Sequence, residues 1–251
     1  MKRLAGIARL NVVVVVMFFS VGCGSLGSLG SLLLSNADAA AGIKDALSKG
    51  LFRGFDALGS TGSSDYALLQ FVMPGEAQDI IRTLNSLGLG PVVNRVTEKF
   101  NLVITGSVQA SKPILINSIK QMTIGDALGI LVTSNKHAAT DYFKNTNYQL
   151  LINAINPVVD SNLRVQKANV DWNIITAAYN ILPVGRNKPL EKDPTSFISA
   201  RIIDGLCQII ANEEENIRDN IAARTTDAMR RAFGYADAMK QRGGNTTTFP
   251  Y

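Results

Sequence analysis

The chain has 251 residues, of which 46% are apolar and 18% are charged, and its formal net charge at pH 7 is +5. This length is enough for one sizeable core, and the composition excludes both a disordered chain and a multispanning membrane protein. Three of the basic residues, Lys2, Arg3 and Arg9, lie at the very start, and the rest of the chain holds 22 basic and 20 acidic side chains. That balance excludes a nucleic-acid-binding protein, which normally carries a dense basic face.

Residues 1–22 have the pattern of a lipoprotein-type signal peptide: a positive start, an apolar run from Val12 to Phe19, and then small residues. The run is about half of the roughly 20 residues that a membrane-spanning helix needs. "SVGC", Ser20 to Cys23, resembles a bacterial lipobox with Ser20 in place of the usual leucine, which predicts acylation of Cys23. A competing site for ordinary signal peptidase is "ADA", Ala37 to Ala39.

Residues 23–41 are rich in Gly, Ser and Leu, a composition typical of a flexible tether. We therefore expect a lipoprotein held through its N-terminal lipid. Gly24 after the cysteine, rather than Asp, resembles lipoproteins sorted to the outer membrane, which predicts a place on the periplasmic side of that membrane. The alternative is a soluble periplasmic protein cut near Ala39. Acylation of Cys23 would leave Cys207 without a disulfide partner, and its apolar surroundings predict a buried, inert thiol.

Residues 42–234 show helical apolar periodicity almost throughout, which predicts one all-α bundle of roughly eight to ten helices. Pro91 and Pro113 each stand where a new helix would begin, and the segment 100–108 alone could pass for a strand. Thr123 with Asp126 is close to a capping box, and Asp193 before Pro194 is a natural N-cap. Residues 235–251 lack an apolar face, which predicts a flexible C-terminal tail.

Several segments, taken in this order, carry a family resemblance: "IKQMTIGDALGIL" (119–131), "AATDYF" (138–143), "AYNILP" (178–183), "IIDGLCQIIANEEENIR" (202–218) and "AARTTDAMRRAFG" (222–234). Together they resemble the bacterial domain-of-unknown-function family 4197, over about Gly42 to Gly234. The resemblance implies a helical, usually exported protein without an assigned activity. The family tends to have Asn-Pro where this chain has Asn220-Ile221, which predicts a less rigid loop.

Several kinds of catalytic or cofactor site have no sequence basis. The chain has one histidine, His137, and too few cysteines for a Cys/His zinc site. It lacks a Gly-rich phosphate loop and a Gly-x-Ser-x-Gly nucleophile elbow. His137 with Asp141 at i+4 is the one basis for a triad, but we expect this histidine to be solvated at the start of a helix. No metal or cofactor is expected.

The stretch "NEEENIRDNIAARTTDAMRRAFG", residues 212–234, is interpreted mainly as two helices being joined and capped. Glu214 and Arg218 have the i,i+4 spacing of a helix-surface ion pair. Thr225 or Thr226 is expected to cap the helix that follows Arg224, with Asp227 favouring the positive end of the helix dipole.

Glu213 falls on the apolar stripe that runs from Ile202 to Ile217, so its carboxylate must be paired, protonated or exposed in a cleft. The favoured interpretation is a structural clamp between Glu213 and Arg224, and the alternative is a ligand-binding or catalytic carboxylate. For a second acid near Glu213, the sequence offers three candidates: Asp126, Asp141 and Asp204.

Aromatic side chains at helical spacing are interpreted as core: Tyr142, Phe143, Trp172 and Tyr179. The sequence therefore favours a non-enzymatic envelope lipoprotein that binds an envelope protein or a small apolar ligand. The alternative is an envelope hydrolase centred on Glu213, which requires a second acid within about 5–10 Å.

Overall fold

The computed structural model describes residues 34–58, 64–70 and 77–244. In these ranges the chain forms ten α-helices, α2 to α11, one short 3-10 helix, η1, and no strand, which confirms the predicted all-α class. The signal peptide, Cys23 and most of the predicted tether lie outside the described residues. Within them, no helix combines the length and the apolar character that crossing a membrane requires.

The elements in chain order are α2 (Asn36–Ala57), α3 (Ser64–Leu69), α4 (Ala77–Ser86), α5 (Gly90–Gln121), α6 (Ala127–Val132), α7 (Ala138–Val165), α8 (Ala168–Asn180), α9 (Pro183–Asn187), α10 (Thr195–Asp219), η1 (Ile221–Ala223) and α11 (Asp227–Gly244).

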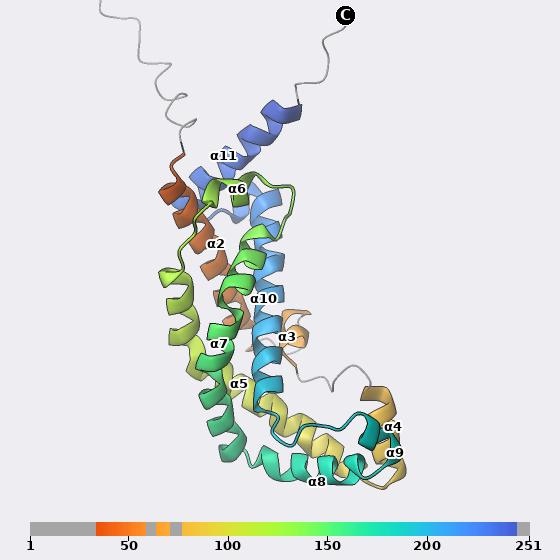
Figure 1. The fold of residues 1–251 in the computed structure, drawn as a ribbon. Helices are drawn as coiled ribbons and strands as arrows, with labels where there is room; N and C mark the ends of the chain where they lie inside the picture. Colours follow the sequence, from red (N-terminus) through yellow and green to blue (C-terminus); the bar gives the residue numbers. More distant parts are fainter. Residues whose placement is uncertain (1–33, 59–63, 71–76, 245–251) are drawn as a thin grey trace, which may run out of the picture.

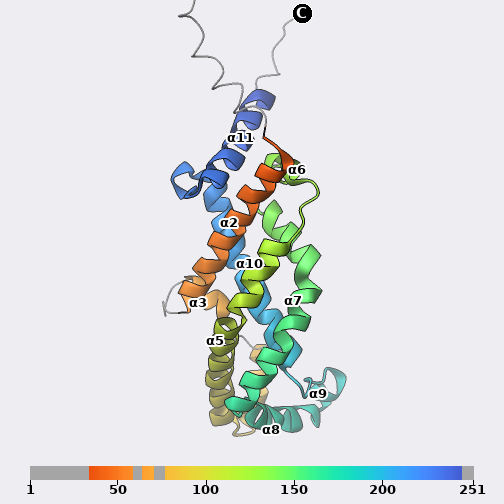
Figure 2. The same ribbon diagram turned by 90° about the vertical axis from the view of Figure 1, so that its left-hand side faces the viewer.

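The long helices pack into an elongated bundle around α10 (Figure 1). Helix α10 packs against α2 and α7, while α11 packs on α2, and α5 on α7. Both views place α6 and α11 with the start of α2 at one end of the bundle, and α8 and α9 at the other (Figures 1 and 2). The family-like segments of α6, α7, α10 and α11 therefore meet at the end where α2 begins.

The core follows the predicted apolar faces. Phe143, Trp172 and Tyr179 are buried, and Trp172 packs on Phe100 with 5.4 Å between the ring centroids. Tyr142 is half-buried, and its hydroxyl donates a hydrogen bond to the carbonyl oxygen of Thr123 at 2.9 Å. The predicted core aromatics therefore all pack in the bundle, with Tyr142 at its edge.

Helix α2 approaches its neighbours closely through small residues on one face. Gly42, Ala46, Gly50 and Gly54 are all buried there, at spacings of four residues. A Cβ atom added at Gly50 would lie 2.7 Å from the Cα of Ile210, so the backbones of α2 and α10 pack directly on each other. Glycine at this position is required by packing and not by backbone conformation.

Pro113 does not begin a helix, because α5 continues through it to Gln121. A proline inside a helix removes one backbone hydrogen bond and bends the helix, and Figure 1 shows α5 changing direction along its length. The segment 100–108, considered as a strand, lies in α5, where Phe100, Val103, Ile104 and Val108 are buried on one helical face. Packing on α7 and α8 outweighs the local breaker signal.

The helical domain is longer at both ends than the predicted residues 42–234. Helix α2 begins at Asn36, capped by Ser35, and Ala39 is fully buried, so the predicted tether is too long. Helix α11 continues to Gly244 instead of giving way to a tail at Tyr235, because Ala236 is buried and Asp237 pairs with Arg224.

Two predicted caps need adjustment. The side chain of Asp126, and not that of Thr123, caps α6 by accepting a hydrogen bond from the amide of Gly129 at 2.8 Å. At α10, Asp193 accepts hydrogen bonds from the amide and the hydroxyl of Thr195, at 2.9 and 2.6 Å, so the helix begins one residue later than predicted.

Candidate functional site

Glu213 lies on the buried face of α10, as predicted, but its partners are different from the expected one. It is only 3% exposed, and its two carboxylate oxygens bind Lys49 and Arg53 of α2 at 2.7 and 2.8 Å. Arg53 also binds Asp65 of α3 at 2.6 Å. Glu213 therefore clamps α10 to α2 and, through Arg53, to α3, and the predicted pair with Arg224 does not form.

The environment of Glu213 keeps its carboxylate ionised at neutral pH. Burial raises the pKa of Glu213, but hydrogen bonds from Lys49 and Arg53, with a weaker one from Asn216, outweigh it, and the net result is a lowered pKa. A carboxylate with a lowered pKa and two bound cations is poorly suited to act as a general acid or base.

The three candidate second acids are held elsewhere in the bundle. Asp126 caps α6, Asp141 accepts a hydrogen bond from the side-chain amide of Asn135 at 2.8 Å, and Asp204 pairs with Lys144 at 2.8 Å. The carboxylate linked to Glu213 is Asp65, through Arg53. The hydrolase alternative gains no support from this arrangement.

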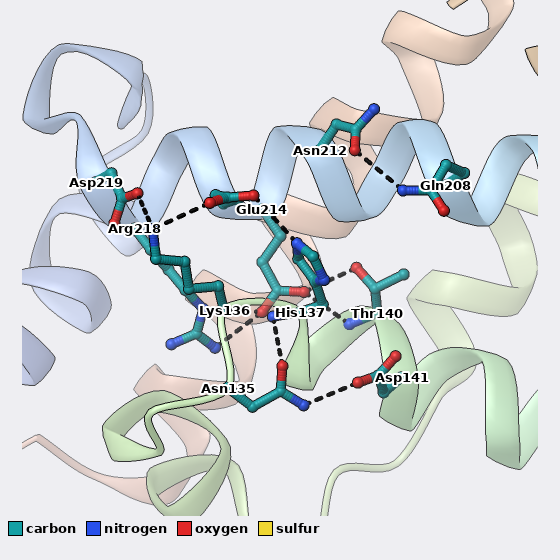
Figure 3. A network of polar contacts seen from close by, with 11 residues as sticks. Asn135, Lys136, His137, Thr140, Asp141, Gln208, Asn212, Glu214, Arg218 and Asp219 are labelled. Atoms are coloured by element: carbon teal, nitrogen blue, oxygen red, sulfur yellow. Dashed lines mark hydrogen bonds and ion pairs between the residues drawn. The ribbon is translucent and has the colours of Figure 1, made fainter.

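Glu214 and Arg218 form an ion pair that is buried, and not on the helix surface as predicted from its spacing (Figure 3). Glu214 accepts hydrogen bonds from the amides of Ala139 and Thr140, at 3.0 and 2.8 Å, and from the hydroxyl of Thr140 at 2.7 Å. Its carboxylate thus caps the N-terminus of α7, where unpaired amides and the helix dipole favour a negative charge.

Arg218 serves the neighbouring helix end. Its two terminal nitrogens donate hydrogen bonds to the carbonyl oxygens of Leu131 and Ile130 at 3.0 Å, in the last turns of α6. One buried ion pair on α10 therefore binds the end of α6 and the beginning of α7. The spacing on α10 predicts the pair, but it does not reveal that the α6–α7 connection covers this face.

Arg224 is 4% exposed and ties α10 to α11. Its guanidinium group donates hydrogen bonds to the carbonyl oxygens of Ile217 and Arg218, at 2.9 and 3.0 Å, and pairs with Asp237 at 2.6 Å. The guanidinium groups of Arg218 and Arg224 both lie over the ring of Phe233, at 5.5 and 5.9 Å from its centroid.

The two threonines after Arg224 have different roles. The hydroxyl of Thr226 caps α11 by accepting a hydrogen bond from the amide of Met229 at 3.1 Å, and it donates one to Asp45 of α2 at 2.7 Å. Thr225 is exposed, and its carbonyl oxygen accepts a hydrogen bond from Arg230 at 3.2 Å. The contacts of Thr226, like those of Arg224, hold helices together. In the loop at Asn220-Ile221, the side chain of Asn220 caps η1 by accepting a hydrogen bond from the amide of Ala222.

His137 does not pair with Asp141. Its Nε2 atom lies 3.3 Å from Glu215, which also binds Lys136 at 3.0 Å, and all three side chains are exposed. Figure 3 shows His137 and Lys136. The His137–Asp141 pair considered for a triad is therefore not formed. Among the described residues, no group of three or more His, Cys, Asp or Glu side chains is placed to hold a metal ion.

Cys207 is buried, as predicted, and it forms no disulfide within the described residues. Burial raises the pKa of Cys207 to about 12, so very little thiolate exists at neutral pH.

A groove lies between α5 and α7, which run side by side in Figures 1 and 2. It has a volume of about 500 Å³. Its lining is uncharged and combines aliphatic side chains with amides and hydroxyls: Ile114, Asn117, Ser118, Gln121, Met122, Thr123, Thr146, Asn147, Leu150, Leu151 and Ala154.

Two sets of residues at these sites were not predicted from the sequence. Lys49 and Arg53, four residues apart on α2, form a basic pair on one helical face, and this spacing was a usable signal for an acidic partner. The groove residues gave no signal, because a groove depends on how α5 and α7 pack and not on either pattern alone.

The fold and these contacts define an all-helical module whose buried ion pairs hold helix ends together. The family model described as "Protein of unknown function (DUF4197)" matches residues 33–234, and the chain belongs to this family. No curated protein matches the chain. No solved structure matches it either.

Proposed function

We propose that this chain is an exported, lipid-anchored module of the cell envelope that binds an uncharged, partly apolar segment of a partner protein and catalyses no reaction. The α5–α7 groove is the single observation that carries this proposal. Its volume of about 500 Å³ lies within the range of protein binding pockets, roughly 300–1,000 Å³.

The lining of the groove favours a protein segment as its occupant. Leu150 is 66% exposed at the groove, and the half-buried Ile114 supplies further apolar surface. Asn117, Gln121 and other amides among the lining residues offer donors and acceptors for a neutral polar chain. Two adjacent helices with a partly apolar groove between them suit an amphipathic helix laid along them.

The start of the fold favours the lipobox over the competing cleavage site. Ala37 to Ala39 lie in the first turn of α2, and Ala39 is fully buried. The side chain of Asn36 donates a hydrogen bond to the carbonyl oxygen of Gly125 at 3.1 Å and accepts one from the amide of Ala127 at 2.8 Å. Cleavage after Ala39 would remove these contacts with α6, whereas cleavage before Cys23 preserves them.

Site-specific photo-crosslinking in cells of the host tests the groove. A photoreactive amino acid replaces Leu150 in one variant and Leu102 in a matched control, because Leu102 is 55% exposed and lies outside the groove. We expect position 150 to give discrete adducts with an envelope protein and position 102 to give none of them. The exchange Ala154→Arg, at an exposed position of the groove lining, should abolish the adducts by filling the groove.

Identical adducts at both positions, or adducts that persist after Ala154→Arg, would contradict the proposed groove. Native mass spectrometry of the same protein, purified from the envelope, separates the other class of occupant. A co-purifying small molecule that is lost after Ala154→Arg would replace the partner protein with a small apolar ligand.

Fatty-acid labelling tests the anchor separately. We expect an alkyne-modified fatty acid to label the wild-type chain and not the Cys23→Ser variant, and equal labelling of both would disprove acylation at Cys23.

A further inference from the structure

Helix α8 carries an apolar stripe on its outer face that no part of the described chain covers. Val170, Ile174 and Ile181 are 56%, 42% and 67% exposed, and Ala177 between them is exposed as well. These four residues, here called the outer stripe, recur at spacings of three or four and so lie along one side of the helix.

The opposite face of α8 accounts for its packing in the bundle. Trp172, Ile175 and Tyr179 are buried, and Asp171 binds Arg95 and Lys99 of α5 at 3.2 and 2.6 Å. With about 100° of rotation per residue, this inner face lies directly opposite the outer stripe. The stripe is therefore not needed for folding, because the inner face alone already anchors α8 to α5.

Exposed apolar side chains concentrate around α8. Of the twelve exposed large hydrophobic residues in the described chain, five lie in residues 165–184. Three belong to the outer stripe, and the other two are Val165 and Val184, which are 72% and 46% exposed. Both views place α8 at the end of the bundle opposite the start of α2 (Figures 1 and 2). Such a concentration at the tip of an elongated molecule marks a contact surface.

The charges near the outer stripe are mainly positive. From Arg164 to Lys192 the chain holds two acidic residues, one of which, Asp171, is buried and paired with two cations. The segment holds five basic residues, two before α8 and three after it: Arg164, Lys167, Arg186, Lys188 and Lys192. The positive charge of Arg164 is balanced by an ion pair with Asp160 at 2.6 Å. The outer stripe itself carries no charge.

We propose that the outer stripe of α8 is a membrane-contact surface, which places its aliphatic side chains at the interface of a bilayer with anionic headgroups. Basic residues at both ends of an uncharged apolar surface favour a bilayer with anionic headgroups, because Lys and Arg side chains close to such a bilayer are attracted by its negative surface potential. A protein partner fits less well, because the stripe lacks the aromatic and Arg side chains that dominate protein interfaces. The surface does not depend on the α5–α7 groove or on acylation of Cys23.

This surface is compatible with a lipid at Cys23 in the same leaflet. The twelve residues from Cys23 to Leu34 reach at most about 40 Å when fully extended. A bundle that lies along the bilayer lets a linker of this reach place the lipid and the outer stripe on one surface.

A label that reports its own surroundings tests the proposal on the full chain. The Ile174→Cys and Leu102→Cys exchanges are each made together with Cys23→Ser, and the new thiol is labelled with the polarity-sensitive fluorophore NBD. Cys207 is common to both variants and is buried. Vesicles of phosphatidylglycerol and phosphatidylethanolamine are compared with vesicles of phosphatidylcholine.

We expect the label at position 174 to shift its emission to the blue and to be quenched by spin-labelled lipids in the anionic vesicles, with a weaker effect in phosphatidylcholine. The label at position 102 should not respond, even if other parts of the chain attach to the vesicle. Equal responses at the two positions would overturn the proposal. A blue shift without lipid quenching would assign the outer stripe to a protein contact, and would overturn it as well.

Removing apolar side chains tests the same surface through binding strength. The double exchange Val170→Ser with Ile181→Ser should weaken binding to the vesicles. The lipid concentration that gives half-maximal quenching at position 174 should rise about tenfold. Because both side chains are exposed, the unfolding curve should not change. An unchanged lipid requirement would contradict the proposal.

Discussion

Glu214 and Arg218 form an ion pair inside the protein, with the Nη2 atom of Arg218 2.8 Å from the Oε1 atom of Glu214. Burying two charges carries a large desolvation penalty, which is offset only when further hydrogen bonds satisfy both groups. Here the amides that begin α7 satisfy Glu214, and the carbonyl oxygens of α6 satisfy Arg218. The pair therefore fixes where the α6–α7 connection crosses α10.

The exchange Glu214→Ala should destabilise the protein strongly. It removes the cap of α7 and leaves Arg218 buried without its counter-charge, and breaking a buried pair in this way typically costs about 3–5 kcal/mol. Urea unfolding followed by circular dichroism measures the change. The neighbouring exchange Glu215→Ala is the matched control, because Glu215 binds only Lys136 and His137 at the surface and should change the unfolding midpoint little. Equal effects of the two exchanges would show that the buried pair is not special.

The paired Glu213 should make stability depend on pH in the acidic range. Burial raises the pKa of Glu213, but the hydrogen bonds from Lys49 and Arg53 lower it by more than burial raises it. The folded pKa therefore lies below the ordinary value of 4.5. The stability contributed by ionised Glu213 is therefore complete above pH 4.5 and is lost as the pH falls through the folded pKa. The measurement is the free energy of unfolding at a series of pH values between about 3 and 7, for wild type and Glu213→Gln.

The difference in unfolding free energy between wild type and Glu213→Gln should shrink as the pH is lowered through this window. A difference that stays constant would mean that Glu213 has the same pKa in the folded and unfolded states. A difference that grows on acidification would mean that its folded pKa is raised, which is the property expected of a catalytic acid.

The chain's own pattern predicts the helical class and the inward position of Glu213, because both depend on periodicity within one helix. The partner of Glu213 was not predictable in the same way. Arg224 is near in sequence, but Lys49 and Arg53 are some 160 residues away, and only the packing of α2 on α10 brings them to the carboxylate. The same limit applies to Glu214, whose burial depends on the α6–α7 connection.

The helix start predicted at Pro113 from a local breaker signal was also wrong. Pro113 is a typical helix start, yet the helix passes through it, because residues on both sides of it pack on neighbouring helices. At the other end of the chain, α11 was predicted to stop near Gly234, and the buried Ala236 with the Arg224–Asp237 pair extends it. In both places tertiary contacts outweigh propensity, which is a weak guide on its own.

Cys207 should resist modification while the protein is folded. Because burial raises its pKa from 9.0 to about 12, the thiolate fraction at pH 8 falls about a thousandfold. The rate of alkylation by iodoacetamide, measured by intact mass in the Cys23→Ser variant, should be lower by a comparable factor in buffer than in 8 M urea. Equal rates in buffer and urea would show that the helices around Cys207 open readily.

Two glycine-to-alanine exchanges should change the stability of the protein in opposite directions. Gly50 lies where α2 packs closely on α10, whereas Gly234 has open space beside it. Alanine is favoured over glycine inside a helix by about 1 kcal/mol, so Gly→Ala stabilises a helix wherever space allows. At Gly50 a Cβ atom would lie 2.7 Å from the Cα of Ile210, so the two backbones must move apart, and overpacking of this kind costs about 1–3 kcal/mol. Gly50→Ala should therefore destabilise the protein.

At Gly234, in α11, no atom lies within 4 Å of an added Cβ, so Gly234→Ala should stabilise the protein by up to about 1 kcal/mol. Thermal unfolding of the two variants beside wild type measures both signs in one experiment. A stabilising Gly50→Ala exchange would mean that α2 and α10 lie farther apart than the structure places them. Because the ion pairs of Glu213 span the same two helices, that result would remove the physical basis of its clamp as well.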